Sequence, residues 1–130
     1  MDIIIPPEEK VFERWGKAVE PYVGDNYSYD ERAVMSTFPY MRLFDISVSQ
    51  ANGDLEGNEN AIDIGFQVET YASGQRASFT IKKLDAISHQ AMKDMGFERT
   101  YGGQIENIDT SVKRYVSRYT MLYTGKLLGE

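Results

Sequence analysis

Apolar residues recur at helical spacing near the start of the chain. The positions that share one side of a 3.6-residue period are Val11, Phe12, Trp15, Ala18, Val19 and Tyr22. Pro6 to Lys10 favour a helix start before them, because proline is tolerated in the first turn and carboxylates complement the positive end of the helix dipole. Pro21 is expected to end the helix, so the pattern predicts a helix over about 7–20.

Two later segments alternate between apolar and polar residues, which is the period of a strand. From Tyr40 onward, Phe44, Ile46 and Val48 share one parity and predict a half-buried strand, and Ile62 to Ala72 alternates most regularly of all. The stretch 50–60 between them is rich in turn-forming and acidic residues, so we expect a hairpin with an unusually long acidic loop. The pattern assigns no structure to residues 27–40.

Helical spacing returns after Ser73, which can cap a second helix. The apolar and small positions that follow are Ala77, Ile81, Leu84, Ile87 or Ser88, Ala91, Met92 and Met95. Gly96 stands where a left-handed helix end belongs, and Phe97 can make the hydrophobic contact that accompanies it.

The last part of the chain predicts one more long strand. A short strand or turn is expected after the second helix, and the chain is expected to reverse at Gly102-Gly103. Val112 to Tyr123 then alternates with apolar side chains on both faces, which predicts a strand that is central or paired with another chain. Lys126 to Glu130 is expected to be a short tail.

The predicted elements together define the fold class. Their order is helix, strand, long loop, strand, helix, short strand or turn, and strand. This order predicts a two-layer α+β fold, in which an antiparallel sheet with a long hairpin carries two main helices on one face. The sheet and helix core is expected to span about 40–123, within a single domain over 1–130.

Composition limits the kinds of binding and catalysis that the chain can support. The chain has 20 acidic and 14 basic residues, a net charge of -6, which argues against tight binding to a nucleic-acid backbone. It has no cysteine and a single histidine, so disulfides, thiolate chemistry and multi-histidine metal sites are excluded. We therefore predict no catalytic residues and no cofactor. The start of the chain lacks a signal-peptide pattern and no apolar run could span a membrane, so we expect a soluble protein kept inside a cell.

Charge is distributed unevenly along the chain. Residues 1–72 hold 14 acidic and 5 basic side chains, a net charge of -9, whereas residues 73–130 hold 6 acidic and 9 basic, a net charge of +3. One surface could therefore suit the opposite surface of a second copy, and such head-to-tail contacts generate rings when the rotation closes. The alternative is that the fold mixes both halves over the surface.

The long loop contains a weak candidate for a metal site. Six residues fall at positions 1, 3, 5, 6, 9 and 12 of a calcium-binding loop: Asn52, Asp54, Glu56, Gly57, Asn60 and Asp63. The first ligand is Asn rather than Asp, the last is Asp rather than a bidentate Glu, and the flanking segments are predicted strands rather than helices. The alternative is a solvated acidic hairpin tip.

Aromatic and basic residues alternate along the last strand. Tyrosine and arginine are enriched at protein contacts, so the interface candidates are Arg114, Tyr115, Arg118 and Tyr119, although aromatic strands of ordinary cores look similar. The acidic loop residues Asp54, Glu56 and Glu59 are candidates for a projecting contact or a tip that faces a channel. His89 is expected on the surface of its helix, without a partner for catalysis.

The segment from Ile62 to Ala77, followed by Ala91 to Arg99, resembles the tail terminator and tail-completion proteins of long-tailed bacteriophages. In that family an alternating strand gives way through a short turn to a helix that closes at Gly-Phe before a hairpin. The final strand with Arg114, Tyr115 and Arg118 fits the same plan, and the resemblance covers about 40–123. The long loop and the aromatic stretch 27–40 are departures from the pattern.

The resemblance implies a virion structural protein without enzymatic activity. It also implies a ring, expected to be a hexamer, that terminates the tail tube and joins it to the head connector. The implied partners are further copies of the chain, the tail tube protein and the head connector proteins, while DNA only passes through the channel and no membrane is involved. The implied location is the head–tail junction of the virion, after synthesis in the bacterial cytoplasm.

Two alternatives stay open. The first is another head–tail connector or a minor capsid or tail protein of a phage. The second is of a different class, a small acidic monomeric or dimeric binding module in which the loop over 52–63 binds a cation.

Overall fold

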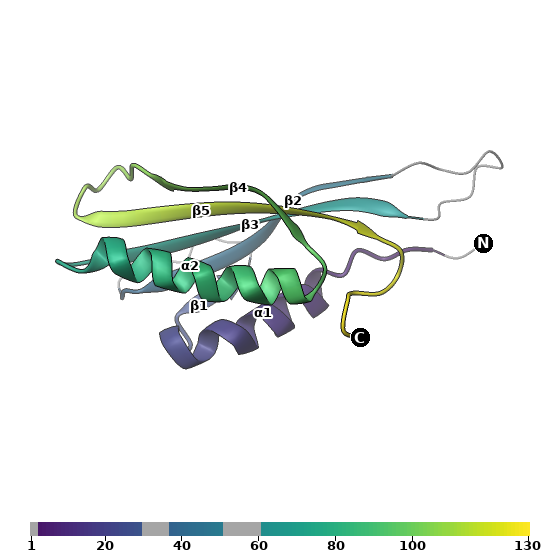
Figure 1. Ribbon diagram of the computed structural model, residues 1–130, viewed down its shortest axis with the longest axis horizontal. Helices are drawn as coiled ribbons and strands as arrows, with labels where there is room; N and C mark the ends of the chain where they lie inside the picture. The colour runs from purple at the N-terminus through teal and green to yellow at the C-terminus, as the bar shows by residue number, and fades with distance from the viewer. Residues whose placement is uncertain (1–2, 30–36, 51–60) are drawn as a thin grey trace.

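The computed structural model describes residues 3–29, 37–50 and 61–130 of the chain (Figure 1). In chain order the elements are α1 (Glu8–Val23), β1 (Tyr27–Tyr29), β2 (Tyr40–Gln50), β3 (Ile62–Ser73), α2 (Ala77–Asp94), β4 (Glu98–Ile105) and β5 (Val112–Tyr123).

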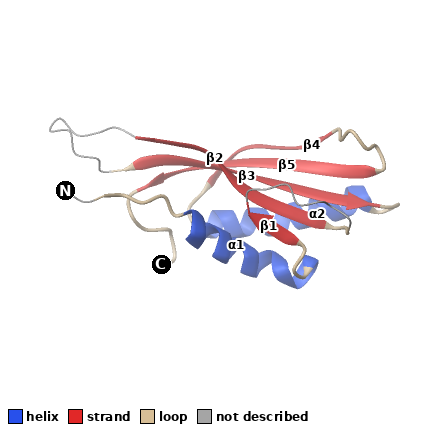
Figure 2. Ribbon diagram, turned by 180° about the vertical axis from the view of Figure 1, so that it is seen from behind, coloured by secondary structure: helices blue, strands red, loops and turns tan. Residues whose placement is uncertain are grey.

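The five strands form one mixed sheet in the order β1-β2-β3-β5-β4. All neighbouring pairs are antiparallel except β1 and β2, which run parallel. Both helices pack on the same face of this sheet, and the other face carries no described helix (Figures 1 and 2). The predicted two-layer α+β fold is therefore confirmed. The parallel pair comes from β1, a three-residue strand within the stretch that the sequence pattern left unassigned.

The core lies between the helices and the covered face of the sheet. Every second residue of β3 points toward the helices, so Phe66 and Val68 pack in one cluster with Val11, Trp15 and Val19 of α1. The last three are completely buried, which confirms the apolar stripe of the first helix. Tyr22 belongs to the predicted stripe but is 50% exposed, because it lies in the last turn, beyond the sheet-facing residues.

The boundaries of both helices differ from the predicted ones. α1 continues through Pro21 to Val23, because a proline near the end of a helix removes only one backbone hydrogen bond, and Gly24 ends the helix with a left-handed φ of 65°. α2 begins at Ala77 rather than at Ser73. Ser73 is still part of β3, where it pairs with Val112, so it cannot cap the helix.

The end of α2 confirms the predicted helix stop. Gly96 has a φ of 102°, its N–H bonds to the carbonyl of Lys93, and the N–H of Phe97 bonds to the carbonyl of Met92 at 3.0 Å. These two bonds are those of a Schellman motif, and Phe97 and Met92 are both buried in the core cluster.

Two predictions for the strands are wrong in detail. In β2 the buried residues are Tyr40, Met41 and Leu43, whereas Ile46 and Val48 are 43% and 44% exposed. The predicted common face of Phe44 and Val48 is also wrong, because the register with β3 shifts between Asp45 and Ser47, so that Phe44 lies opposite Gln67 and Val48 opposite Ile64. Gly102 and Gly103 do not form a turn but lie within β4, opposite Ser117 and Val116 of β5. The chain reverses instead over residues 106–111.

Candidate functional site

The helix-free face of the sheet carries an unusual buried carboxylate. Gln67, Glu69 and Tyr71 alternate along β3 with the residues that face the helices, so they point to the opposite side. Glu69 is nevertheless only 1% exposed. The register explains this burial, because it places Arg42 of β2 directly opposite Glu69 and Arg114 of β5 directly opposite Tyr71.

Glu69 receives hydrogen bonds at both carboxylate oxygens. Its Oε1 accepts from Nε and Nη2 of Arg42, each at 2.9 Å, and from the hydroxyl of Tyr71 at 2.5 Å. Its Oε2 accepts from Nη2 of Arg114 at 2.9 Å and from Nε2 of Gln67 at 2.5 Å. Three strands therefore converge on one carboxylate, and Glu69 is held in a single position.

A third arginine extends this group toward the edge of the sheet. Nε of Arg118 donates to Oε1 of Gln67 at 2.9 Å, and the guanidinium of Arg118 lies 5.6 Å from the ring centre of Tyr101 on β4. On the other side, the guanidinium of Arg42 lies 4.7 Å from the ring centre of Phe44. We refer to Arg42, Gln67, Glu69, Tyr71, Arg114 and Arg118 as the arginine cluster.

The electrostatics of the cluster are dominated by its cations. Burial alone would raise the pKa of Glu69, but hydrogen bonds from Tyr71 and Arg114 and the charge of Arg42 outweigh it and lower the pKa below its ordinary value. Burial and the bond to Glu69 raise the pKa of Tyr71 to about 12. With Glu69 ionised and Tyr71 neutral, three arginines face one carboxylate, and the cluster has an excess of positive charge.

This arrangement suits recognition better than proton transfer. Glu69 is already occupied by five donor atoms, so it has little capacity left to accept a proton from a substrate. Its effect is to fix the guanidinium groups of Arg42 and Arg114, whose side chains keep 22% and 26% of their surface exposed. Guanidinium groups fixed in this way can bind carboxylates of a protein partner.

The structure divides the four predicted interface residues between both faces of the sheet. Arg114 and Arg118 belong to the arginine cluster. Tyr115 is half-buried on the helix side, against Ala72, Ala77 and Ile81. Tyr119 is completely buried in the core, so its prediction as a surface contact is wrong; successive residues of a strand point to opposite faces, and the helices cover the face of Tyr119.

Tyr119 instead joins a buried polar group beneath the sheet. Nη2 of Arg99 donates to the hydroxyl of Tyr119 at 3.0 Å and to Asp85 of α2 at 2.7 Å, and Asp85 also accepts from Ser117 at 2.6 Å. His89 is half-buried beside this group, with Nδ1 3.3 Å from the same hydroxyl, so its expected surface position is wrong. Burial and the nearby charge of Arg99 lower the pKa of His89.

Sequence reasoning missed Arg42 and Glu69. A glutamate at a polar position of an alternating strand reads as solvent-facing, and nothing local marks it as buried. The sequence holds one weak signal of this burial. The polar-face residues Gln67, Glu69 and Tyr71 of β3 all have side chains long enough to cover one another. The strand register was needed to bring the two arginines onto the same carboxylate.

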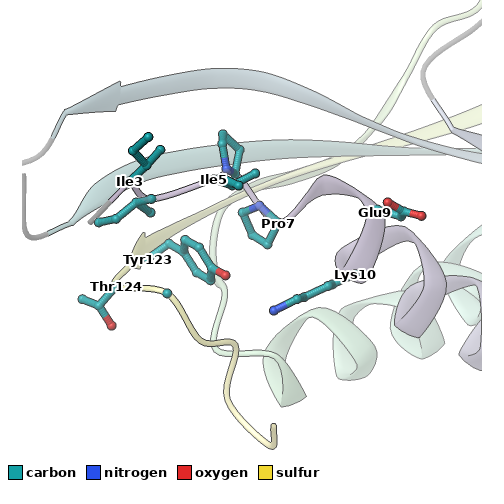
Figure 3. A pocket seen from close by; sticks show the side chains of 10 residues that line it. Ile3, Ile5, Pro7, Glu9, Lys10, Tyr123 and Thr124 are labelled. Atoms are coloured by element: carbon teal, nitrogen blue, oxygen red, sulfur yellow. The ribbon is translucent and has the colours of Figure 1, made fainter. Parts of the chain in front are cut away.

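A hollow lies away from the cluster, at the opposite end of β5 (Figure 3). It is a groove of about 470 Å³ between the N-terminal segment Ile3 to Pro7 and the end of β5 at Tyr123. Its walls are mainly apolar, and the ammonium group of Lys10 is paired with Glu130 at 3.2 Å. We assign no chemistry to this groove.

The candidate metal loop cannot be placed in the structure. Asn52, Asp54, Glu56 and Glu59 lie outside the described residues, and Asp63 is an exposed residue of β3. Within residues 3–29, 37–50 and 61–130, no three acidic or histidine side chains are grouped so that they could hold a metal ion. None of the described helices is long and apolar enough to cross a membrane.

Comparison with known proteins yields no identification: no model of a protein family matches the chain, and no curated protein matches its sequence significantly.

Proposed function

We propose that this protein is a structural subunit of a bacteriophage neck, which assembles into a ring that terminates the tail tube and joins it to the head connector. The observation that carries the proposal is the arginine cluster on the helix-free face of the sheet. In a chain with a net charge of -6, two arginines bind one buried carboxylate and a third bonds to the neighbouring Gln67, on a face that no described helix covers. Such a face suits a partner protein.

The order of the elements also supports the proposal. The segment that resembles tail terminator proteins corresponds to β3, α2 and the start of β4. Its strand, short turn and helix ending at Gly96-Phe97 are followed by the β4–β5 pair, in the order that the resemblance implies. The acidic chain is compatible with a channel wall that repels DNA phosphates and lets the genome pass.

Assembly is the first test of this function. Light scattering of the purified protein over a concentration series at low and moderate salt should detect a particle of about six copies, because head-to-tail contacts close into rings. Negative-stain images of that fraction should show a central hole. A monomer at all concentrations and salts would contradict the ring.

A variant pair tests whether the arginine cluster contributes to the ring. Arg118→Glu combined with Tyr101→Ala removes an exposed cation and the exposed ring beneath it, and should reduce the assembled fraction. Tyr119 is unsuitable for such a test, because its truncation would open the core. Lys82→Glu on the exposed side of α2 is the matched charge reversal and should leave assembly unchanged.

The neck function itself can be tested with tail tubes. The tail tube protein encoded in the same phage genome should polymerise into long tubes alone and into shorter, capped tubes when this protein is added. Tubes of unchanged length, without particles at their ends, would argue against a terminator.

A further inference from the structure

The two edges of the sheet differ in how they are protected. β4 forms one edge, and within the described part of the chain only its inner side is paired, with β5. Proteins usually protect such edges with charges, prolines, bulges or covering loops. β4 has a register shift between Arg99 and Tyr101, but the six residues Thr100 to Ile105 contain neither charge nor proline. This edge is therefore open for pairing with another strand.

Within the described residues, the opposite edge is open over part of its length. β1 pairs with β2 only from Met41 to Leu43. From Phe44 onward, the described residues place no strand on the outer side of β2, and the apolar side chains of Ile46 and Val48 are about half exposed there. This open part of β2 has the length of an ordinary strand.

The sheet topology places the acidic part and the basic part of the sequence at opposite edges of the sheet. β1, β2 and β3 come from the first part of the chain, whose described residues up to 72 hold 8 acidic and 4 basic side chains, a net charge of -4, and α1 packs beneath β1 and β2. β5 and β4 come from residues 73–130, which have a net charge of +3. The two halves are thus not mixed across the sheet. The edge at β2 belongs to the acidic half and the edge at β4 to the basic half.

The strand directions allow these edges to meet in a second copy. β2, β3, β5 and β4 alternate in direction, because each neighbouring pair is antiparallel. β4 therefore runs opposite to β2. When a second copy lies beside the first in the same orientation, its β2 is antiparallel to the β4 of the first, so no subunit has to be inverted.

We infer that β4 of one copy pairs with the outer side of β2, from Phe44 onward, in the next copy, so that the sheet continues from subunit to subunit. The inference rests on the proposed ring and names the contact that builds it. Two different edges meet, so the contact is head-to-tail and leaves one open edge at each end until the ring closes. Main-chain hydrogen bonds would hold the strands, and the opposite charges of the two halves favour the orientation.

Cysteine crosslinking tests this contact directly, because the chain has no cysteine of its own. Gln104 of β4 and Val48 of β2 are both exposed and lie on the same side of the sheet, opposite Tyr115 and Ile64 respectively. The double variant Gln104→Cys with Val48→Cys, treated with a short bis-maleimide, should give a ladder of covalent oligomers. Each single variant should stay monomeric on a denaturing gel, and so should the control Gln104→Cys with Lys17→Cys on α1.

The outcomes of crosslinking and light scattering distinguish failure of the proposed strand contact from failure of the proposed ring. Dimers from the single variant Gln104→Cys would show that two β4 edges meet each other and would overturn the inference. A ring in light scattering without any crosslink in the double variant would also overturn it and leave the proposed function intact. If light scattering finds only monomers, the proposed function fails, and the inference fails with it.

A charge at the edge provides a second test. Gln104→Glu places a negative charge on the open strand opposite the acidic half of the next copy, and it should abolish the assembled fraction while the thermal unfolding of the monomer stays the same. Gln90→Glu makes the same chemical change on the exposed side of α2 and should leave the assembly as it is. Full assembly of Gln104→Glu would contradict pairing at β4.

Discussion

The order of the helix-free face depends on the charge balance among a few side chains. Glu69 compensates the charges of Arg42 and Arg114, and each of these arginines is mostly covered by its neighbours. A buried ion pair contributes little by itself, but removal of one partner leaves the other charge without compensation. Glu69 is therefore the residue of the cluster that tolerates substitution least.

We expect Glu69→Gln to lower the free energy of unfolding by about 3 kcal/mol, because two partly buried guanidinium groups lose their counter-charge. Urea denaturation at neutral pH measures this loss. Glu98→Gln, an exposed position of β4, is the matched control and should change the stability by less than about 0.5 kcal/mol. Equal stability of both variants would show that the arginines do not depend on Glu69.

The lowered pKa of Glu69 also predicts a pH dependence. A carboxyl group with a lower pKa in the folded state contributes stability above its unfolded pKa, about 4.3, and loses that contribution as the pH falls through the folded value. The wild type should thus lose stability in acid below about pH 4.3, and Glu69→Gln should lose less over the same range. Chemical denaturation at a series of pH values measures the two slopes.

His89 should act at a higher pH. Its folded pKa is lowered, so the unfolded chain binds a proton more readily, and stability should decline as the pH falls below about 6.5 toward the folded value. His89→Gln removes this titration and should flatten the stability profile over that interval. An unchanged profile in the variant would show that His89 is not responsible for the slope.

At the scale of elements, local signals were predictable from sequence and tertiary ones were not. The end of α2 was predictable, because Gly96 and Phe97 carry the required backbone freedom and hydrophobic contact within a few residues. β1 was not, because three residues become a strand only through their pairing with β2. The start of α2 was misplaced for a similar reason, since pairing with β5 keeps Ser73 in β3.

In the candidate site, too, local features were predictable from the sequence and tertiary contacts were not. Arg114 and Arg118 were identified from the composition of their strand, but their partners Glu69 and Gln67 lie about 45 and 51 residues away and depend on the register between β3 and β5. Tyr119 was assigned to the wrong face because a strand with apolar residues on both sides does not show which side the helices cover. Burial of Glu69 could be inferred only from the folded sheet.

The helix stop at Gly96 gives a prediction for an element. Gly96→Ala should destabilise the protein by about 1–2 kcal/mol, because alanine tolerates a positive φ poorly. Its Cβ would also lie 3.2 Å from Cε of Met121. Gly24 also has a positive φ, of 65°, but a Cβ there would meet nothing within 4 Å, so Gly24→Ala measures backbone strain without crowding. Thermal unfolding of both variants measures the difference.

A buried hydrogen bond joins the two helices in the core. Nε1 of Trp15 donates to the hydroxyl of Ser88 at 2.8 Å, and both side chains are completely buried. Ser88→Ala should therefore cost about 1–3 kcal/mol, because it leaves a buried N–H without an acceptor. Ser88→Thr keeps an acceptor and serves as a comparison, and urea denaturation of the two variants measures the effect. A neutral Ser88→Ala would mean that Trp15 finds another acceptor.

At the scale of the whole molecule, the last residues hold the helix layer and the sheet together. The expected short tail contains Leu127, which is buried, and the N–H of Leu128 bonds to the carbonyl of Met95 at 3.0 Å. The carbonyl of Leu128 accepts from Arg14 of α1 at 2.7 Å. The tail thus connects the end of β5 to both helices.

Removal of residues 126–130 should lower the free energy of unfolding by about 2–4 kcal/mol, from the lost burial of Leu127 and the lost hydrogen bonds. Leu127→Ala separates the burial from the bonds, and Lys126→Ala at an exposed position is the control. Guanidinium denaturation of the three variants measures these differences. A truncated protein as stable as the wild type would contradict this function of the tail.

The place of β3 in the sheet also affects how the protein is made. β3 is the central strand, and its second neighbour, β5, is the last element of the chain. On the ribosome, β2 and β3 can pair soon after they emerge, but one side of β3 keeps its main-chain groups free until β5 has been synthesised. Non-local pairing of this kind slows folding. During that interval the nascent chain is most exposed to aggregation, because the free edge of β3 can pair with another chain.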